Sequence, residues 1–403
     1  MKSILIQADA YYPKSNPVAK RMRSFALQFV AKGWEVTVIT LCDLNESKKI
    51  IFKEIEGVNV CYIPYKNLGI KSTIGRLKQG LFLYRQSKRI KKFIQKKIDY
   101  VLVTSPELIP CLAGIKLKRQ YKAKLVFDIR DIWPDIGYQM EKFTSHSIYG
   151  IGFSWITNKL YKHADFITTV SPSKVEILKK KKWVKSPDKV ILIENGFDDT
   201  MLDLEYDIDI IDRLKLKEKK IISFVGNVGL AQGLDKFIHL ARSYKEDDNY
   251  RFIIVGRGSD KTRLIELVKQ EGLKNIEFYD YVSQNGVYSI IKHSYIGFIA
   301  LVSSKLSDSI PTKLYENLGL GCPTLLLASG DAPKILEECK LGLSAPPENE
   351  NYVLEAFKNM IENYDYYVSN KEYASERIIT YHSRSVHAAK LERILSEIIE
   401  VKE

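Results

Sequence analysis

The sequence contains few cysteines and histidines, and neither residue type is spaced to bind a metal or to form a disulfide framework. The five cysteines are scattered, odd in number and without a Cys-x-x-Cys pair. The six histidines also lack the spacing of metal ligands. We therefore expect buried cysteines that behave as small apolar residues, and no metal site.

Long apolar runs are missing as well. No stretch reaches the roughly 18 apolar residues that a membrane-spanning helix requires. The first residues, Met1 to Ala8, form a strand-like run and lack the small-residue cleavage site of a secretory signal. We expect a cytoplasmic chain that is at most peripheral on the inner face of the cell membrane.

Charge is distributed unevenly along the chain. The net charge is +13, but residues 1–190 carry 36 Lys and Arg against 15 Asp and Glu, whereas the remaining residues carry 26 against 34. A basic half indicates an anionic partner, such as nucleic acid, anionic lipid or a phosphorylated substrate. A solvated lysine-rich surface is the alternative, and composition alone does not decide between them.

Short runs rich in Val, Ile and Leu alternate with stretches of helical periodicity, and the pattern restarts after Asn195-Gly196. This alternation predicts an α/β protein with two doubly wound, Rossmann-like domains facing a cleft, whose parallel sheets are covered on both faces. The expected strands lie at residues 3–8, 35–41, 100–104, 123–128, 166–170, 190–193, 221–225, 252–255, 276–279, 296–301 and 324–327.

The restart also predicts the domain limits. We place an N-terminal domain at residues 1–195 and a C-terminal domain at residues 196–375. Residues 376–403 are expected to form a C-terminal helix that crosses back to the N-terminal domain.

The most informative stretch runs from Ser307 to Pro323 and reads S-D-S-I-P-T-K-L-Y-E-N-L-G-L-G-C-P. Ser309 suits an N-cap and Pro311 suits the first turn, so a helix is expected to begin here. The free N–H groups of a helix start, with a lysine nearby, form a site for a phosphate. Glu316, about one turn inside, can accept hydrogen bonds from two ribose hydroxyls.

Asp308 and Glu316 lie eight positions apart with this helix start between them. The spacing resembles the E-x7-E motif of retaining glycosyltransferases of the GT-B fold, in the large family 4. The resemblance implies that Glu316 binds the donor ribose and that Asp308, one methylene shorter than the family's residue, lies against the donor sugar. The helix start that the resemblance assigns to the donor comprises Ser309, Ile310, Pro311, Thr312 and Lys313.

Other stretches are similar to the same family and span nearly the whole chain. Phe224–Asp235, which contains Gly226 and Gly233, is similar to the loop that faces the donor diphosphate, and Val255–Gly258 resembles the second glycine turn. Ile193–Gly196 resembles the interdomain turn, and Val126–Pro134 the strand that ends at the cleft. The combination looks like that of bacterial transferases of capsule, O-antigen and exopolysaccharide assembly, including those for N-acetylated amino sugars such as fucosamine.

The chain departs from the family where a diphosphate needs positive charge. Many members place Arg and Lys in the 224–235 loop, whereas Asn227 and Gln232 stand there in this sequence. Stabilisation of the leaving group is usually a major catalytic contribution, so another cation should replace them. The candidates, in order, are Lys313, Lys305 and Arg257.

A second departure lies at the end of the 126–130 strand, where many members have a histidine and this chain has Arg130 followed by Asp131. A guanidinium cannot act as a base near neutral pH, but it can bind a phosphate or a carboxylate. Asp131 can orient an acceptor hydroxyl or balance Arg130. The alternative is an Arg–Asp pair that only holds the loop.

The stretch from Arg76 to Lys97 combines many basic residues with apolar residues at helical spacing. A cationic amphipathic helix of this kind can lie on an anionic membrane, and the expected contact residues are Arg85, Lys88, Arg89 and Lys92. The alternative is an ordinary surface helix that packs on the sheet. Nucleic acid is not expected, because no binding module accompanies the charge.

Taken with the resemblance, these features predict a glycosyltransferase that moves a hexose or N-acetylhexosamine from a nucleotide-sugar, a UDP-sugar in the first instance, to a lipid-linked or oligosaccharide acceptor. The resemblance implies that residues 1–195 are the acceptor-binding domain and residues 196–375 the nucleotide-sugar-binding domain. It also implies retention of configuration and a reaction without a metal; the nucleotide-sugar is a co-substrate and no cofactor is expected. A sugar-nucleotide epimerase of the same fold and a non-enzymatic protein that binds anionic lipid or nucleic acid remain alternatives.

Overall fold

The computed structural model describes residues 1–403 except residues 15, 44–48, 67–72 and 401–403. The chain forms two compact units. The first consists of Met1–Asn195 and the segment that begins at Arg384, and the second of Gly196–Ser383.

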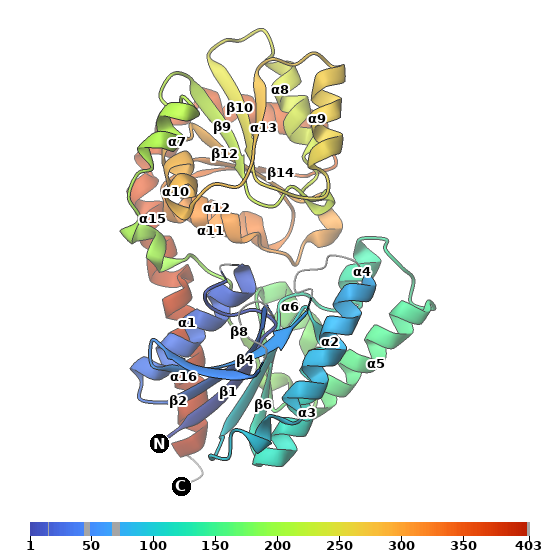
Figure 1. The fold of residues 1–403 in the computed structure, drawn as a ribbon. Helices are drawn as coiled ribbons and strands as arrows, with labels where there is room; N and C mark the ends of the chain where they lie inside the picture. The colour runs from blue at the N-terminus through green and yellow to red at the C-terminus, as the bar shows by residue number, and fades with distance from the viewer. Residues whose placement is uncertain (15, 44–48, 67–72, 401–403) are drawn as a thin grey trace. The chain divides into compact units, whose positions relative to one another are not determined.

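In the described part of the first unit, eight strands form one sheet in the order β3-β4-β2-β1-β5-β6-β7-β8 (Figure 1). All neighbouring strands are parallel except β3 and β4. The strands are β1 (Ser3–Gln7), β2 (Glu35–Asp43), β3 (Ile51–Ile55), β4 (Val58–Tyr65), β5 (Tyr100–Thr104), β6 (Lys124–Ile129), β7 (Phe166–Thr169) and β8 (Val190–Leu192). Strands β1 and β5 are buried along their whole length, as continuous apolar runs covered on both faces should be.

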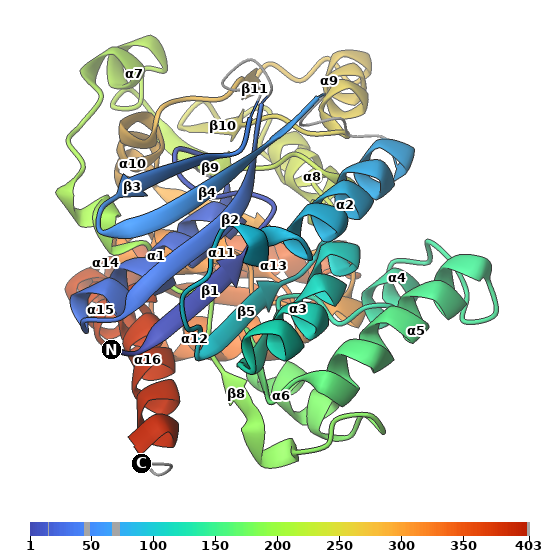
Figure 2. The same ribbon diagram turned by 60° about the horizontal axis from the view of Figure 1, so that its bottom comes forward.

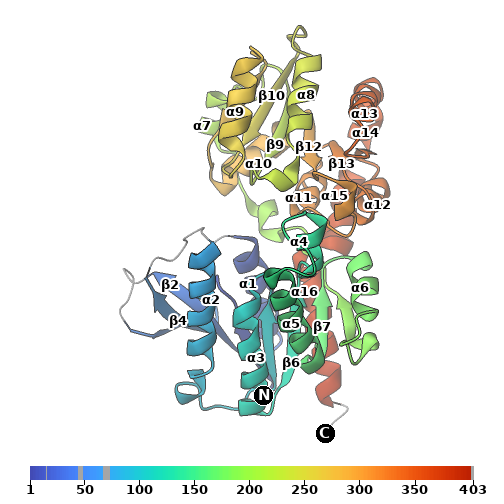
Figure 3. The ribbon, with the colours of Figure 1, turned by 90° about the vertical axis from the view of Figure 1, so that its right-hand side faces the viewer.

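Helices cover both faces of this sheet (Figures 2 and 3). Helices α1 (Pro17–Ala31) and α16 (Arg384–Glu400) share one apolar core with the sheet. The other face packs against α2 (Thr73–Ser87), α3 (Leu108–Tyr121), α5 (Ile148–His163) and α6 (Pro172–Lys179). The short helix α4 (Asp135–Gln139) lies between β6 and α5 in the chain.

The C-terminal helix α16 is part of the first unit's core. Leu391 and Leu395 are fully buried. The indole N–H of Trp34 donates a hydrogen bond to Glu392 at 2.9 Å, and the hydroxyl of Tyr100 donates to the carbonyl of Leu395 at 2.8 Å. These contacts hold the last helix on the sheet through both apolar packing and directed bonds.

The second unit contains a six-stranded parallel sheet in the order β11-β10-β9-β12-β13-β14. Its strands are β9 (Lys220–Val225), β10 (Tyr250–Val255), β11 (Ile276–Tyr279), β12 (Ile296–Ala300), β13 (Thr324–Leu327) and β14 (Gly342–Ala345). In sequence order this is the 3-2-1-4-5-6 arrangement of dinucleotide-binding folds, in which the chain changes direction between strands 1 and 4. The predicted α/β class with two Rossmann-like domains is confirmed.

The helices of the second unit follow the strands in alternation, as the sequence pattern predicts. They are α7 (Ile208–Arg213), α8 (Asp235–Ser243), α9 (Lys261–Gln270), α10 (Gln284–His293), α11 (Thr312–Gly319), α12 (Asp331–Cys339), α13 (Glu350–Glu362), α14 (Tyr364–Ser369) and α15 (Lys371–His382). Among the described residues of both units, no helix combines the length and the apolar character that crossing a bilayer demands. All five cysteines are buried and free, as expected.

The prediction of one amphipathic helix across residues 76–97 is wrong. Helix α2 ends at Ser87, and a short 3-10 turn, η1 (Ile90–Lys92), follows it. Leu83, Ile90 and Ile94 are buried in the core of the first unit, because they pack beneath the sheet instead of facing solvent. The basic residues Arg85, Lys88, Arg89 and Lys92 stay on the surface with full or partial exposure.

Candidate active site

The candidate donor site lies at the carboxyl edge of the second sheet. The loops that follow β9, β10 and β12 all emerge at this edge, because the three strands are parallel. The order places the ends of β9 and β12 on either side of the switch point, where ligands bind in open α/β sheets. Residues 226–233, 256–260 and 301–311 therefore form the rim of the site.

The two glycine turns at this edge pack against each other. The N–H of Gly226 donates to the carbonyl of Val255 at 2.9 Å, and the N–H of Val228 donates to the carbonyl of Arg257 at 2.9 Å. A Cβ atom at Gly256 would lie 1.8 Å from the carbonyl oxygen of Gly226. Glycine is required at position 256 by this close approach of two backbones. The second turn thus supports the first loop.

Helix α11 begins two residues later than the sequence suggests. Its N-cap is Pro311, no side chain of the described residues caps it, and its first residue is Thr312. The expectation that Ser309 is the N-cap is wrong, because the helix starts only after Pro311. Ser309 belongs instead to the turn after η5 (Ser304–Leu306), where its N–H donates to the carbonyl of Leu306 at 2.9 Å. A helix start without a side-chain cap leaves N–H groups to meet an anion.

Lys313 is brought to the glycine loop by this helix. Its ammonium nitrogen donates to Oε1 of Gln232 at 2.9 Å and lies 3.7 Å from the ring centre of Phe224 in β9. The residue as a whole is half-buried, but its amine is enclosed beside Gly226, where an added Cβ would lie 3.2 Å from Nζ. Burial lowers the pKa of Lys313 to about 7, against the raising effect of Glu316.

The two acidic residues of the motif lie on either side of the start of α11. Asp308 is buried in the loop before the helix, and Glu316 is half-buried on the helix itself. Glu316 stands three positions after Lys313, so the two side chains share a face of the helix. A cation and a carboxylate on that face can meet the diphosphate and the ribose of one nucleotide.

The other candidate cations are placed differently. Lys305 is exposed on η5, in a loop that Glu348 holds by accepting bonds from the N–H and hydroxyl of Ser304, both at 2.6 Å. Arg257 is exposed, and its Nε lies 4.0 Å from Asp280. Asn227 is exposed as well. Lys313 thus brings its charge into contact with the 226–233 loop.

In the first unit, Arg130 and Asp131 follow the carboxyl end of β6. The guanidinium of Arg130 donates to the carbonyl of Ser105 at 2.9 Å, and the backbone N–H of Arg130 donates to the Ser105 hydroxyl at 2.9 Å. Burial lowers the pKa of Arg130, while Asp128 and Asp131 act in the opposite direction. The arginine is thus fixed by the neighbouring strand's loop, with Asp131 half-buried beside it.

The buried ion pair of this region was not foreseen from the sequence. Arg21 of α1 donates two bonds to Asp128, at 2.8 and 3.2 Å, and also donates to the carbonyls of Ile193 and Glu194 at 2.8 and 2.6 Å. Burial acts to raise the pKa of Asp128, but Arg21 and hydroxyl donors hold it below its usual value. The pair ties α1, β6 and the turn after β8 together.

Two further carboxyl groups at this edge, one of them close to Arg130, were also missed. Burial raises the pKa of Asp9, which follows β1, although Arg130 lowers it. Burial also raises the pKa of Glu107, and the charge of Asp9 adds to the effect. These acids lie at the carboxyl edge of the first sheet, after β1 and β5, and the sequence offered only their position after a strand as a signal.

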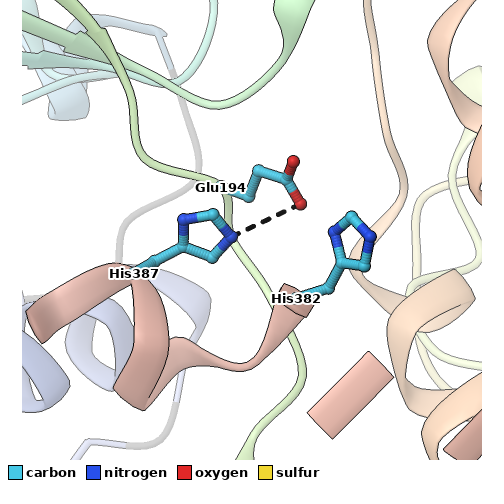
Figure 4. A group of neighbouring side chains, drawn as sticks. All are labelled: Glu194, His382 and His387. Carbon is cyan, nitrogen blue, oxygen red and sulfur yellow. Dashed lines mark ion pairs between the residues drawn. The ribbon is translucent and has the colours of Figure 1, made fainter. Parts of the chain in front are cut away.

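The turn that begins at Ile193 carries a second pair within the first unit. Glu194 lies 3.5 Å from the imidazole of His387 in α16, and both side chains are almost fully buried (Figure 4). Nε of Arg384 donates to the carbonyl of Asn195 at 3.1 Å. These contacts hold the turn on the C-terminal helix, and the bonds of Arg21 hold it on α1.

Comparisons with known proteins agree with this geometry. Residues 18–200 match the family described as Glycosyltransferase Family 4, and residues 207–377 match the family described as Glycosyl transferases group 1. The second match includes the loops after β9, β10 and β12 and the whole of α11. The chain is a GT-B glycosyltransferase. The predicted resemblance is therefore confirmed.

This glycosyltransferase is similar to a protein of Escherichia coli (strain K12) described as the colanic acid biosynthesis glycosyl transferase WcaI. The two are 23% identical over 81% of this chain and 83% of the relative. Its fold is similar to sucrose-phosphate synthase of Thermosynechococcus elongatus, with a TM-score of 0.79, 14% identity and complete coverage of both chains. It is also similar to HepE of Anabaena in complex with UDP-glucose, with a TM-score of 0.72 and 12% identity over 98% of this chain and 100% of the other.

Proposed function

We propose that this glycosyltransferase transfers a hexose or N-acetylhexosamine from a UDP-sugar to a lipid-linked or oligosaccharide acceptor in surface polysaccharide synthesis, with retention of configuration. The similarity to WcaI supports the polysaccharide context, and the HepE complex with UDP-glucose supports the donor. The observation that carries the proposal is the contact of Lys313 with Gln232 at the start of α11.

The donor groups are assigned by their chemistry. The N–H groups at the start of α11 and the ammonium of Lys313 bind the diphosphate, and Glu316 accepts the ribose hydroxyls. Asp308 lies before the helix, where it can face the sugar. Ser309, Ile310 and Thr312 shape the loop, and Gly226 and Gly233 let the backbone approach the phosphates.

Charge stabilisation is the main catalytic role in this assignment. When the bond between the anomeric carbon and the diphosphate breaks, negative charge grows on the leaving diphosphate. Lys313 and the helix start stand ready to meet this charge, as preorganised groups do in an enclosed site. We propose that they allow the reaction to proceed without a metal ion.

The acceptor is assigned to the first unit. Arg130 and Asp131 lie at the carboxyl edge of its sheet, and Asp131 can orient or accept the proton of an acceptor hydroxyl. Asp9 and Glu107 add acidic groups at the same edge. A lipid-linked acceptor would bring the protein to the membrane surface, where the basic first unit faces anionic headgroups; we propose a peripheral location on the inner face.

A thermal shift experiment tests the donor assignment. UDP, GDP, ADP and CMP are added separately in the presence of EDTA, because a ligand that binds the folded state raises its melting temperature. We expect UDP to stabilise the protein and Glu316→Ala to remove most of this shift without lowering the ligand-free melting temperature. An unchanged UDP shift in Glu316→Ala would contradict the ribose assignment.

Turnover measurements separate the alternatives. Consumption of the UDP-sugar that depends on a glycan acceptor supports transfer, whereas conversion to an isomeric sugar without acceptor supports an epimerase. Tight binding to anionic lipid or nucleic acid with no nucleotide shift would support a non-enzymatic protein.

A further inference from the structure

The first two turns of helix α5 present large apolar side chains to solvent. The exposed fractions are 88% for Ile148, 61% for Tyr149, 60% for Ile151 and 58% for Trp155. The opposite side of the helix is buried against the unit through Leu160 and Tyr161. Helix α5 is therefore apolar on its outer side as well as on its inner side. A helix whose outer side is in contact with water alone normally carries polar residues there.

These exposed residues stand on a rigid base. The ring of Phe153 lies 4.9 Å from Trp133 and 5.7 Å from Phe143. Phe143 in turn packs so closely on Gly137 of α4 that an added Cβ there would lie 2.2 Å from the phenyl ring. The serine before the helix accepts a hydrogen bond from Gly150, so the helix start is capped. The outward residues are held in place by this aromatic cluster.

Lysines surround the exposed aromatic rings. Lys159 lies 4.7 Å from the ring of Trp155, and Lys162 and Lys182 lie 5.7 and 5.4 Å from the ring of Trp183. Trp155 and Trp183 line one groove together with Lys159 and Lys162. The stretch 141–190 contains ten lysines and four acidic residues. Tryptophan and tyrosine among lysines are the composition of a helix at a membrane interface.

We propose that the α5 surface, made of Ile148, Tyr149, Ile151, Trp155 and Trp183 with the lysines around them, docks on an anionic lipid bilayer. The apolar side chains would enter the acyl boundary while Lys159 and Lys162 meet the headgroups. A second copy of this chain fits less well, because two lysine-rich surfaces repel each other. The charge of the surface thus selects anionic lipid as the partner.

The position of the α5 surface in the first unit indicates what membrane docking would achieve. This step rests on the proposed function. Helix α5 begins at the carboxyl edge of the sheet, since it follows β6 and α4 and runs back towards β7 (Figure 1). Arg130 and Asp131 follow β6 at the same edge. A bilayer in contact with Ile148 and Ile151 would present a lipid-linked acceptor close to these residues.

Sedimentation with vesicles tests the proposal against the surface that sequence analysis favoured. The variant Ile148→Ser/Ile151→Ser/Trp155→Ser removes exposed apolar groups from α5. Its matched control, Leu77→Ser/Leu81→Ser/Phe93→Ser, removes three exposed apolar groups from the surface of α2 and the turn after it. With vesicles of phosphatidylglycerol and phosphatidylcholine, we expect the α5 variant to bind at least tenfold more weakly and the control to change less than twofold.

A depth measurement completes the test. Brominated acyl chains should quench the fluorescence of the wild-type protein, and Trp155→Phe should remove most of this quenching. Equal vesicle binding by the α5 variant and the wild type overturns the proposal. A loss of vesicle binding in the control variant as large as that in the α5 variant overturns it as well. A third result also overturns the proposal: the wild type does not bind vesicles but forms a dimer in sedimentation velocity, and the α5 variant does not form this dimer. That result identifies a second copy of the chain as the partner.

The vesicle-binding test does not depend on the proposed donor site in the second unit. UDP should shift the melting temperature of the α5 variant as it does that of the wild type, because the variant changes only the first unit. If UDP has no effect on either protein while vesicle binding follows the pattern above, the proposed donor site fails and the α5 surface stands.

Discussion

Replacement of Lys313 by methionine separates the stability of the protein from its function. Methionine keeps a long apolar side chain over Phe224 but removes the amine that donates to Gln232. We expect the variant to be more stable than the wild type without ligand at pH 7, and to bind the nucleotide more weakly. A residue that only supported the fold would show the opposite change in stability.

The size of the stability gain in Lys313→Met follows from the pKa of the Lys313 amine. Burial lowers this pKa from 10.5 to about 7. Each pKa unit corresponds to about 1.4 kcal/mol, so a charged Lys313 costs the folded state at most about 5 kcal/mol. The side chain keeps partial exposure and solvent screens the charge, so we expect a gain of about 1–2 kcal/mol from the substitution. For a unit of this size that is a rise of about 3–6 °C in melting temperature.

The pH dependence of this gain has a definite sign. The unfolded lysine keeps its pKa near 10.5, so between pH 7 and 10.5 the unfolded state binds more protons than the folded state. The penalty is complete below pH 7 and decreases as the pH rises towards 10.5. The advantage of Lys313→Met should therefore be largest at pH 7 or below and vanish at high pH.

Calorimetry with and without UDP measures both effects. We expect UDP to bind Lys313→Met at least tenfold more weakly, a loss of about 1.4 kcal/mol or more. Lys305→Met is the matched control, because Lys305 is an exposed lysine of the neighbouring turn; its stability should not change. A Lys313→Met protein that is less stable at pH 7, or whose stability difference is the same at every pH, would refute the reasoning.

Two further predictions follow from charged groups. The affinity of the wild type for UDP should fall about tenfold for each unit above pH 7, because the fraction of protonated Lys313 falls by that factor, and titration calorimetry of Lys313→Met should show no such fall. Asp128→Ala should destabilise the protein by about 3–5 kcal/mol in urea unfolding, because it leaves Arg21 charged and buried. Glu56→Ala, which breaks the more exposed pair with Arg23, should cost less than about 1 kcal/mol.

The parallel strands could be predicted because a strand covered on both faces is a continuous apolar run. Every expected strand has a counterpart in the structure. Two of the missed strands lack this signal. β3 has three exposed residues in its middle, and β14 is a short Gly-Leu-Ser-Ala run with partial exposure. Strand β4 was missed with β3, its antiparallel partner, because their connection is the two-residue turn Glu56-Gly57 rather than a helix.

The donor site was predicted better in its residues than in its local geometry. The helix after Pro311, the acid at 316 and the lysine at 313 lie where the spacing puts them. The cap was wrong because the helix starts only after Pro311, and Ser309 belongs to the turn after η5, which the sequence does not mark. The contact of Lys313 with Gln232 joins residues 81 positions apart, and spacing along one helix carries no information on it.

Arg21 illustrates a charge hidden within an apolar pattern. It lies next to Met22 on the buried side of α1, among Val18 and Phe25. Periodicity explains the apolar neighbours but assigns an arginine at this position to the surface by default. Its partner Asp128 belongs to the motif that resembles the family, so an acid at the end of a buried strand was the available signal that a basic residue from elsewhere must meet it.

The two candidate membrane surfaces show why burial must be known before amphipathic character can be interpreted. Residues 76–97 have the stronger sequence pattern, yet Leu83, Ile90 and Ile94 pack in the core against the sheet, so a large part of the apolar side of that pattern is already covered. Helix α5 has few charges in its first two turns and no clear polar side, which in sequence favours burial on both sides. Because only one side is covered, its remaining apolar residues need a partner, and the lysines that follow them in the chain match that partner to anionic lipid.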